Sequence, residues 1–167
     1  MSSKLASIAA KSMATILVVF LAIAAMLNLR VGFGAQNTDC LDSFMHIVHY
    51  KTPDRIKAGE YVVFVGPEVM KEPFAGHLVI KQVAAIAGDS IKVNDGYIYI
   101  NGEKVGQLDV ADKAAKRLGV SEDSFNLEKT IPDGFIFVRG TKPRSFDSRY
   151  WGLLPIKNVV GSAYPII

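Results

Sequence analysis

The chain of 167 residues is poor in the residues that mark several classes of protein. It has one cysteine, Cys40, so no disulfide can form within the chain. His46, His49 and His77 are the three histidines, and none has a cysteine or histidine partner at the spacing of a zinc site. His46 and His49 lie three residues apart, which would suit a metal on a helix, but we expect a strand and a turn there. The sequence therefore predicts no metal centre and no cofactor.

Charge of either sign is also sparse, and its distribution excludes one partner class. There are 19 basic and 16 acidic residues, which gives a formal net charge of +3. The chain has no lysine- and arginine-rich run with interleaved aromatic residues, so nucleic acid is not an expected partner. Apolar residues, in contrast, make up 50% of the chain. This share is high for a soluble domain, and part of the chain is expected to face lipid.

The amino-terminal region contains one long apolar run without charge, at residues 13–27. Small residues on both sides extend it towards the roughly 20 residues that a membrane span needs. Lys4 and Lys11 precede the run and favour a cytoplasmic amino terminus. We therefore predict a cytoplasmic segment at residues 1–12, a transmembrane anchor at 13–31, a linker at 32–37 and an exported domain at 38–167.

A cleaved secretory signal is the alternative interpretation of the same run. Small residues near its end could form a cleavage site. The run is longer than the apolar core of a typical signal, which favours an uncleaved anchor. Both interpretations place the rest of the chain outside the cytoplasm.

The exported part has the pattern of a mainly β domain. Turn signals separate short runs that alternate in polarity or are rich in β-branched residues. Asn94-Asp95-Gly96 between two such runs is a hairpin signal. Residues 109–118 have helical composition and predict one short inserted helix. We expect a compact barrel or folded sheet system, with strands at residues 61–65, 77–83, 90–93, 97–100 and 134–138.

Three patches, in order along the chain, resemble the signal peptidase I family, whose members are peptidases with a serine–lysine pair. Residues 78–90 resemble the strand that carries the lysine and the Gly-Asp turn that follows it. Residues 97–103 are similar to a hairpin that ends in Asn-Gly, and residues 144–155 resemble the Asp-Ser-Arg-Tyr-Trp-Gly box. The short chain looks most similar to the conjugal-transfer branch called TraF, which processes pilin or other transfer proteins.

The resemblance implies a signal peptidase-type fold with a transmembrane anchor. It also implies an endopeptidase that acts on an exported precursor or pilin, on the periplasmic side of the inner membrane. The expected partners are therefore that precursor and the membrane itself.

Lys81 is the expected general base of such an enzyme. It interrupts an otherwise apolar strand at residues 79–83. Surrounding hydrocarbon disfavours the charged ammonium form, and a neutral amine can take a proton from a nucleophile. Periodicity alone would favour a lysine on the solvent face, because lysines are usually exposed. The match of the flanking residues to the family favours the buried base.

The nucleophile departs from the pattern of the family. The conjugal branch has a Thr-x-Ser-Leu/Met-Pro segment before the turn that opens the first strand, and residues 38–42 fall in that place. Cys40 stands where serine is expected, and Asp42 stands where proline is expected. A thiol needs less help from a base than a hydroxyl, so Cys40 is the expected nucleophile. Ser43 is the alternative nucleophile, although it is out of register with the segment.

The resemblance also implies supporting roles for four residues. The hydroxyl of Thr38 and the backbone N–H of Cys40 would form the oxyanion hole. Asp147 and Arg149 would hold a loop beside the lysine through charge-assisted hydrogen bonds. Ser148 would form a hydrogen bond near the amine of Lys81. Without the resemblance, Asp147 and Arg149 could equally be an exposed pair of little energetic weight.

Three classes of function stay open at this point. The first is an endopeptidase that forms an acyl-enzyme and either hydrolyses it or joins the new terminus to another amine. The second is an inactive protein of the same fold that serves as a pilus-assembly or scaffold component, which would explain the cysteine at position 40. The third is a membrane-anchored binding module, which would leave Lys81 and the Asp147–Arg149 pair unexplained.

Overall fold

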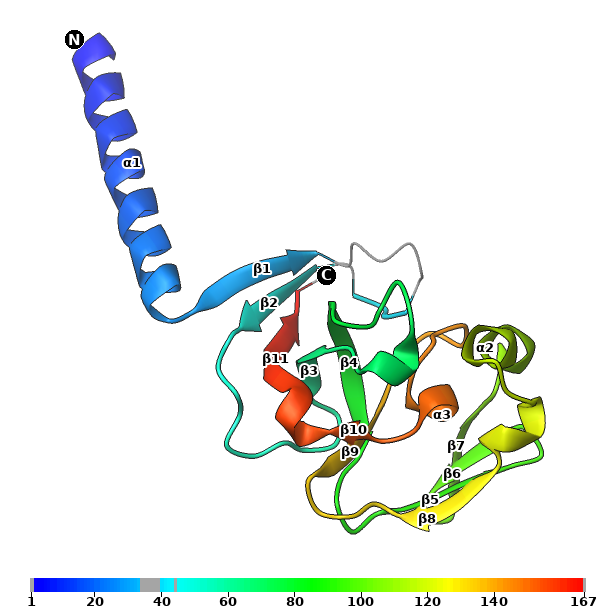
Figure 1. The fold of residues 1–167 in the computed structure, drawn as a ribbon. Coiled ribbons are helices and arrows are strands. Elements are labelled where there is room, and N and C mark those ends of the chain that lie inside the picture. The colour runs from blue at the N-terminus through cyan, green and yellow to red at the C-terminus, as the bar shows by residue number, and fades with distance from the viewer. Residues whose placement is uncertain (1, 34–39, 44, 167) are drawn as a thin grey trace.

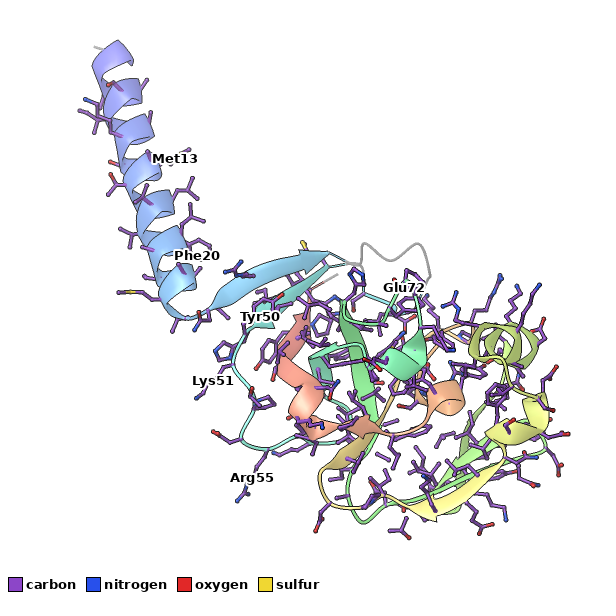
Figure 2. All side chains as sticks on the ribbon, in the orientation of Figure 1. Met13, Phe20, Tyr50, Lys51, Arg55 and Glu72 are labelled. Carbon is purple, nitrogen blue, oxygen red and sulfur yellow. The ribbon has the colours of Figure 1, made fainter. Side chains whose placement is uncertain are left out.

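The computed structural model describes residues 2–33, 40–43 and 45–166. One long helix at the amino terminus stands apart from a β-rich domain (Figure 1). The helix is α1 (Ser2–Met26), and its part Leu5–Met26 is long and apolar enough to cross a membrane. Figure 2 shows Met13 and Phe20 on this helix, apart from the domain, and 72% and 65% of their surface is exposed. A signal sequence meets the same criterion of length and composition, so the criterion alone does not distinguish it from a membrane anchor.

The helix has different limits from the predicted anchor at residues 13–31. It begins at Ser2 and ends at Met26, and Asn28 follows with a positive φ of 52°. Residues 29–33 then form strand β1 (Leu29–Phe33), which pairs antiparallel with β2 (Met45–His49). The predicted anchor includes residues 29–31 and the predicted linker includes residues 32–33. In the structure, the backbone groups of these residues bond to β2, a partner that local composition does not reveal.

In the part of the domain that the structure describes there are two antiparallel sheets, which confirms the predicted mainly β class. The larger sheet has the strand order β1-β2-β11-β3-β4-β9-β10, and the smaller has the order β7-β6-β5-β8. The remaining strands of the larger sheet are β3 (Tyr61–Val65), β4 (Leu78–Ala85), β9 (Phe135–Arg139), β10 (Leu154–Pro155) and β11 (Val159–Pro165). The smaller sheet contains β5 (Ser90–Asn94), β6 (Tyr97–Ile100), β7 (Glu103–Gln107) and β8 (Leu127–Thr130).

Short helices connect the strands, and the predicted inserted helix is confirmed. It is α2 (Ala111–Leu118), which lies between β7 and β8 and ends at Gly119 in the left-handed conformation. The predicted hairpin joins β5 and β6 through Asp95 and Gly96, which both have positive φ. The other helical elements among the described residues are α3 (Ser148–Trp151) and three short 3₁₀ turns, η1 (Glu68–Met70), η2 (Glu122–Phe125) and η3 (Ile156–Asn158).

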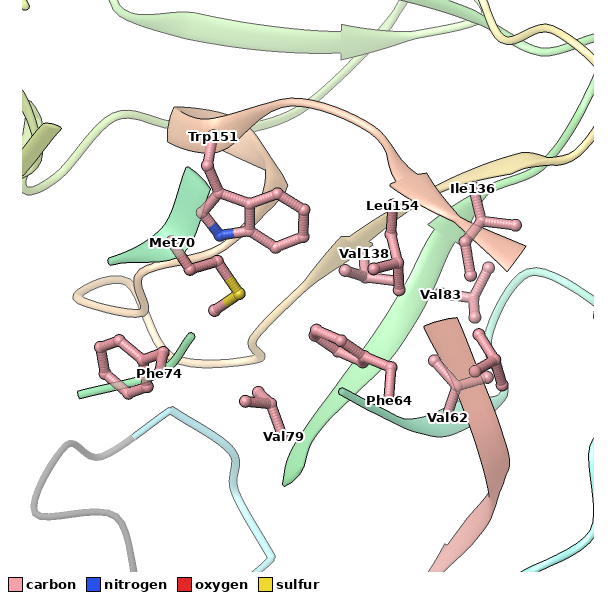
Figure 3. Close-up of a cluster of buried hydrophobic side chains, with 11 residues drawn as sticks. Val62, Phe64, Met70, Phe74, Val79, Val83, Ile136, Val138, Trp151 and Leu154 are labelled. Carbon is pink, nitrogen blue, oxygen red and sulfur yellow. The ribbon is translucent and has the colours of Figure 1, made fainter. Parts of the chain in front are cut away.

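The main core lies on one face of the larger sheet and includes the inward side of β4. Phe64 of β3 and Trp151 of α3 lie in its centre, with their ring centroids 6.3 Å apart (Figure 3). Along β4, buried residues alternate with more exposed ones. Val79 and Val83 contribute to this core, and Lys81 lies between them on the same face, because side chains two residues apart in a strand share a face. The fold therefore aims a lysine at an apolar interior.

Candidate functional site

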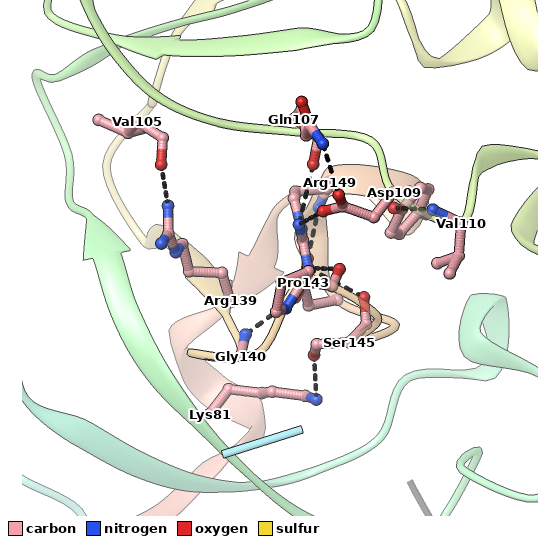
Figure 4. A network of polar contacts seen from close by, with 12 residues as sticks. Lys81, Val105, Gln107, Asp109, Val110, Arg139, Gly140, Pro143, Ser145 and Arg149 are labelled. Carbon is pink, nitrogen blue, oxygen red and sulfur yellow. Dashed lines mark hydrogen bonds and ion pairs between the residues drawn. The ribbon is translucent and has the colours of Figure 1, made fainter. Parts of the chain in front are cut away.

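Lys81 is a buried lysine in the middle of strand β4. Only 1% of its surface is exposed, and its neighbour in β3 is Val62, which is also buried. Its Nζ donates a hydrogen bond to Oγ of Ser145 at 2.7 Å (Figure 4). Lysine is almost never fully buried without a partner, because water solvates the ammonium ion strongly. A desolvated amine with one hydroxyl partner is suited to proton transfer, and this role for Lys81 stays a prediction.

Ser145 comes from the loop of residues 140–147, which connects β9 with α3. It is fully buried, and its backbone N–H donates to the carbonyl oxygen of Lys142 at 3.2 Å. The sequence patterns do not single out Ser145, and Ser148 is the serine they predict beside the amine. In the structure, Oγ of Ser148 accepts the backbone N–H of Val138 at 3.1 Å, and its expected hydrogen bond near Lys81 stays a prediction. The two serines share one sequence patch, but Ser148 begins a helix, whereas Ser145 lies in the loop before it.

Asp147 and Arg149 form a buried ion pair that holds this loop. Asp147 is fully buried and Arg149 is 7% exposed. Nε of Arg149 donates to Oδ1 of Asp147 at 2.8 Å, and Nη2 donates to Oδ2 at 3.0 Å. Oδ2 also accepts the backbone N–H of Gly140 at 2.8 Å. The alternative of an exposed pair is therefore wrong, and the carboxylate ties the start of the loop to its end.

The guanidinium of Arg149 also fixes the backbone of the loop from within. Nη2 donates to the carbonyl oxygens of Pro143 and Ser145, each at 3.1 Å (Figure 4). Burial alone would lower the pKa of Arg149, but the hydrogen bond and charge of Asp147 raise it above its ordinary value. Arg149 is therefore permanently charged, and it supports the residue that bonds to Lys81 without being able to exchange a proton.

Cys40 lies against the same loop. It is 6% exposed, and its carbonyl oxygen accepts the backbone N–H of Lys142 at 3.2 Å. A Cβ atom at Gly140 would lie 2.3 Å from this carbonyl oxygen and 2.2 Å from Oγ of Ser145. Both oxygens therefore contact the same side of Gly140, where only a hydrogen fits. The absence of a side chain at Gly140 thus brings the segment that carries Cys40 next to the hydroxyl partner of Lys81.

Asp42, which stands in place of the expected proline, attaches the Cys40 segment to the domain. Its backbone N–H donates to Oγ1 of Thr141 at 2.7 Å, and its carboxylate lies 2.9 Å from Nζ of Lys142. Hydrogen bonds from Lys142 and Thr141 lower the pKa of the Asp42 carboxyl. Ser43, the alternative nucleophile, is the next residue and is half-buried. Thr38 lies outside the described residues, so its place in an oxyanion hole stays a prediction.

His46 and His49 do not point to a common site. His46 and His49 both lie on strand β2, three residues apart, so their side chains are on opposite faces of the sheet. Among residues 2–33, 40–43 and 45–166, no group of three or more His, Cys, Asp and Glu side chains is placed to hold a metal ion. The chemistry of the described site is therefore that of an amine, a hydroxyl and a thiol-bearing segment.

The site thus consists of an amine and a hydroxyl joined by a hydrogen bond, beside a segment that carries a cysteine. A lysine amine in an apolar interior can serve as base or acid, and a cysteine thiol can attack a carbonyl carbon. Comparison with known proteins then identifies the family. The family model described as "Signal peptidase, peptidase S26" matches residues 5–167, and the chain belongs to this family. The predicted relationship to signal peptidase I is thus confirmed.

Individual relatives agree with this assignment. A probable signal peptidase I-1 from Synechocystis is 30% identical over 69% of this chain and 55% of its own length. Signal peptidase I V from Bacillus subtilis is 31% identical over 77% of this chain and 74% of its length. Thylakoidal processing peptidase 1 from Arabidopsis thaliana is 32% identical over 63% of this chain and 30% of its length.

The chain spans about half the length of the first relatives that it matches. A solved signal peptidase I from Enterococcus faecalis aligns with 26% identity and a TM-score of 0.41, over 65% of this chain and 96% of that chain.

Proposed function

We propose that this protein is a membrane-anchored endopeptidase that cleaves an exported precursor through Cys40 and Lys81. One observation carries the proposal. Lys81, which is 1% exposed, donates a hydrogen bond to the buried hydroxyl of Ser145, and this hydroxyl and the carbonyl oxygen of Cys40 both lie against Gly140. Membership of the signal peptidase family supports the peptidase activity and the precursor as substrate.

The first half of the reaction forms an acyl-enzyme. Lys81 takes the proton of the Cys40 thiol, and the sulfur attacks the carbonyl carbon of the scissile amide. The ammonium of Lys81 then donates a proton to the leaving nitrogen, and the C–N bond breaks to leave a thioester on Cys40. The backbone N–H of Cys40 and the hydroxyl of Thr38 would stabilise the oxyanion.

The second half releases the new carboxyl terminus. The amine of Lys81 takes a proton from water, and the hydroxide attacks the thioester. The carboxylate leaves as the sulfur regains a proton from Lys81. Throughout the cycle, Oγ of Ser145 accepts a hydrogen bond from Nζ and keeps the amine oriented. If an amine of another chain replaced water, the same thioester would give a joined product.

Helix α1 would hold the domain at the bilayer surface. Lys4 and Lys11 at the start of the helix favour a cytoplasmic amino terminus, and the domain would then lie on the periplasmic side of the inner membrane. The outer face of the adjoining strands carries an apolar pair, Ile47 of β2 opposite Tyr164 of β11, with 38% and 55% of their surface exposed. Such a face suits the edge of a bilayer, where a precursor emerges.

We propose a pilin or other precursor of a conjugative transfer system as the substrate. The resemblance of residues 38–42 to the segment of the conjugal-transfer branch supports this finer assignment. Purified full-length protein in detergent would be offered a pilin precursor and, separately, a general secretory precursor. Cleavage of the secretory precursor alone would contradict the conjugal role.

The matched variants test the chemistry. We expect Cys40→Ala and Lys81→Met to abolish processing, and Lys81→Arg to fail as well, because a guanidinium cannot act as a neutral base. Lys92→Met is the control, because it removes a lysine from strand β5 that is exposed and paired with Glu128. Ser43→Ala should process normally.

A second candidate function is a scaffold of the same fold without catalysis. The cysteine at the expected serine position favours it. If Cys40→Ala processes the precursor normally and Ser43→Ala does not, the nucleophile is Ser43 and not Cys40. If the wild-type protein cleaves neither precursor while it still binds pilin, the scaffold replaces the peptidase.

A further inference from the structure

An aromatic cluster connects the Ser145 loop with the rest of the domain. Phe146 is half-buried and lies between Ser145 and Asp147, which are both fully buried. Its ring stacks on Phe74 with centroids 5.9 Å apart, and on Tyr150 with centroids 6.1 Å apart and 12° between the ring planes. Phe74 belongs to the connection between β3 and β4. Strand β4 carries Lys81. The ring of Phe146 therefore links the loop to a second segment next to the site.

Arg117, in the last turn of α2, contacts both rings. Its guanidinium carbon lies 5.1 Å from the centroid of Phe74 and 5.0 Å from the centroid of Phe146. Both distances are within the roughly 6 Å of a cation–π interaction. One planar cation thus bridges the two aromatic residues across the surface of the domain.

Helix α2 packs against a small core, which fixes the backbone position of Arg117. Ala114 and Ala115 are buried in a small core that also contains Phe125 and Tyr150. The hydroxyl of Tyr150 accepts the backbone N–H of Val110, the residue before the helix, at 3.1 Å. Phe125 packs edge-on against Tyr150, with centroids 5.4 Å apart. Tyr150 therefore contacts both the start of the helix and, through Phe146, the Ser145 loop.

We propose that Arg117 is a positioning residue of the site: by bridging Phe74 and Phe146, it keeps Oγ of Ser145 within hydrogen-bonding distance of Nζ of Lys81. This inference rests on the proposed function and assigns a role to the inserted helix. A contact can change the balance between two positions of a loop only by the difference in its interaction energy between those positions. For exposed cation–π contacts this energy is modest. Loss of both contacts should therefore lower kcat by about three- to tenfold.

The test compares two neighbouring residues of α2 in full-length protein. Arg117→Met keeps an apolar stem and removes the cation, whereas Lys116→Met removes the same charge one position away and leaves Arg117 and both rings in place. We expect Arg117→Met to lower kcat with little change in KM or melting temperature, and Lys116→Met to match the wild type. Arg117→Lys should recover part of kcat, because an ammonium still binds the rings but lacks the planar fork.

A double-mutant cycle with Ser145→Ala separates this role from a general effect on the fold. If Arg117 acts through Ser145, Arg117→Met should have almost no further effect on kcat in the Ser145→Ala background. An equal loss of kcat in both backgrounds would overturn the inference, as would a kcat of wild-type size in Arg117→Met alone.

Amide hydrogen exchange keeps this inference separate from the proposed function. Exchange at residues 144–147 should be faster in Arg117→Met than in the wild type or Lys116→Met, whether or not any precursor is cleaved. Failure of the wild-type protein to cleave would defeat the peptidase proposal. Unchanged exchange would defeat the positioning role of Arg117.

Discussion

Gly140 offers the sharpest test of how the site is assembled. In Gly140→Ala, the added Cβ would lie 2.2 Å from Oγ and 2.5 Å from Cβ of Ser145, and 2.3 Å from the carbonyl oxygen of Cys40. One of these neighbours is backbone, so a rotamer change alone cannot make room. The glycine is not among the residues with positive φ, so the effect of the substitution is steric and not conformational.

The size of the effect follows from packing. Forcing an extra methyl group into a filled interior costs about 1–3 kcal/mol. For a domain of this size, about 1 kcal/mol corresponds to roughly 4 °C in melting temperature, so we expect a fall of about 4–12 °C. Because the methyl group separates Ser145 from Cys40, processing should fall by more than the loss of folded protein explains.

Gly106→Ala is the matched control, because its Cβ would meet Nη1 of Arg139 at 3.5 Å and Cδ1 of Ile98 at 3.8 Å, which are ordinary contacts. We expect this variant to keep wild-type activity and to have a similar or slightly higher melting temperature. Thermal unfolding by circular dichroism and precursor cleavage would be measured on the same preparations. Wild-type stability and activity in Gly140→Ala would refute the close approach of Ser145 and Cys40 at this position.

Three further predictions concern stability. Asp147→Asn removes the carboxylate that bonds to Nε and Nη2 of the buried Arg149 and leaves its guanidinium the weaker ion pair with Asp109 at 3.5 Å, so it should destabilise the fold by about 3 kcal/mol in urea unfolding. A change below about 1 kcal/mol would contradict the role of Asp147 in holding the loop. Burial lowers the pKa of His46 below its ordinary 6.5, so the unfolded chain binds more protons below that pH and stability falls as the pH falls. In His46→Leu this part of the pH dependence should vanish, and an unchanged dependence between pH 5 and 7.5 would exclude His46 as its source. Tyr150→Phe removes the acceptor of the Val110 N–H and should cost about 1 kcal/mol by the same assay, whereas no loss would mean that this hydrogen bond is dispensable.

Local pattern determined much of the fold. The run at residues 61–65 is β3 without change, and the hairpin through Asp95 and Gly96 joins β5 to β6 as predicted. The strand and the hairpin depend on the period of two in a strand and on turn residues, which neighbouring positions encode by themselves. The local pattern around Lys81 favoured a solvent-facing lysine, and the match to the family motif favoured the buried face on which the structure places it.

The sequence by itself determined the apolar amino-terminal run, the mainly β domain and the family motifs around Lys81 and Asp147. Only the tertiary structure decided which serine meets the amine, because Lys81 and Ser145 are 64 residues apart and come together through the packing of a loop on a strand. It also decided that residues 29–33 form a strand, since their hydrogen-bond partners lie in β2. Contacts between distant segments depend on which surfaces fill the same interior volume, as Gly140 shows for Cys40 and Ser145, and no local pattern carries that information.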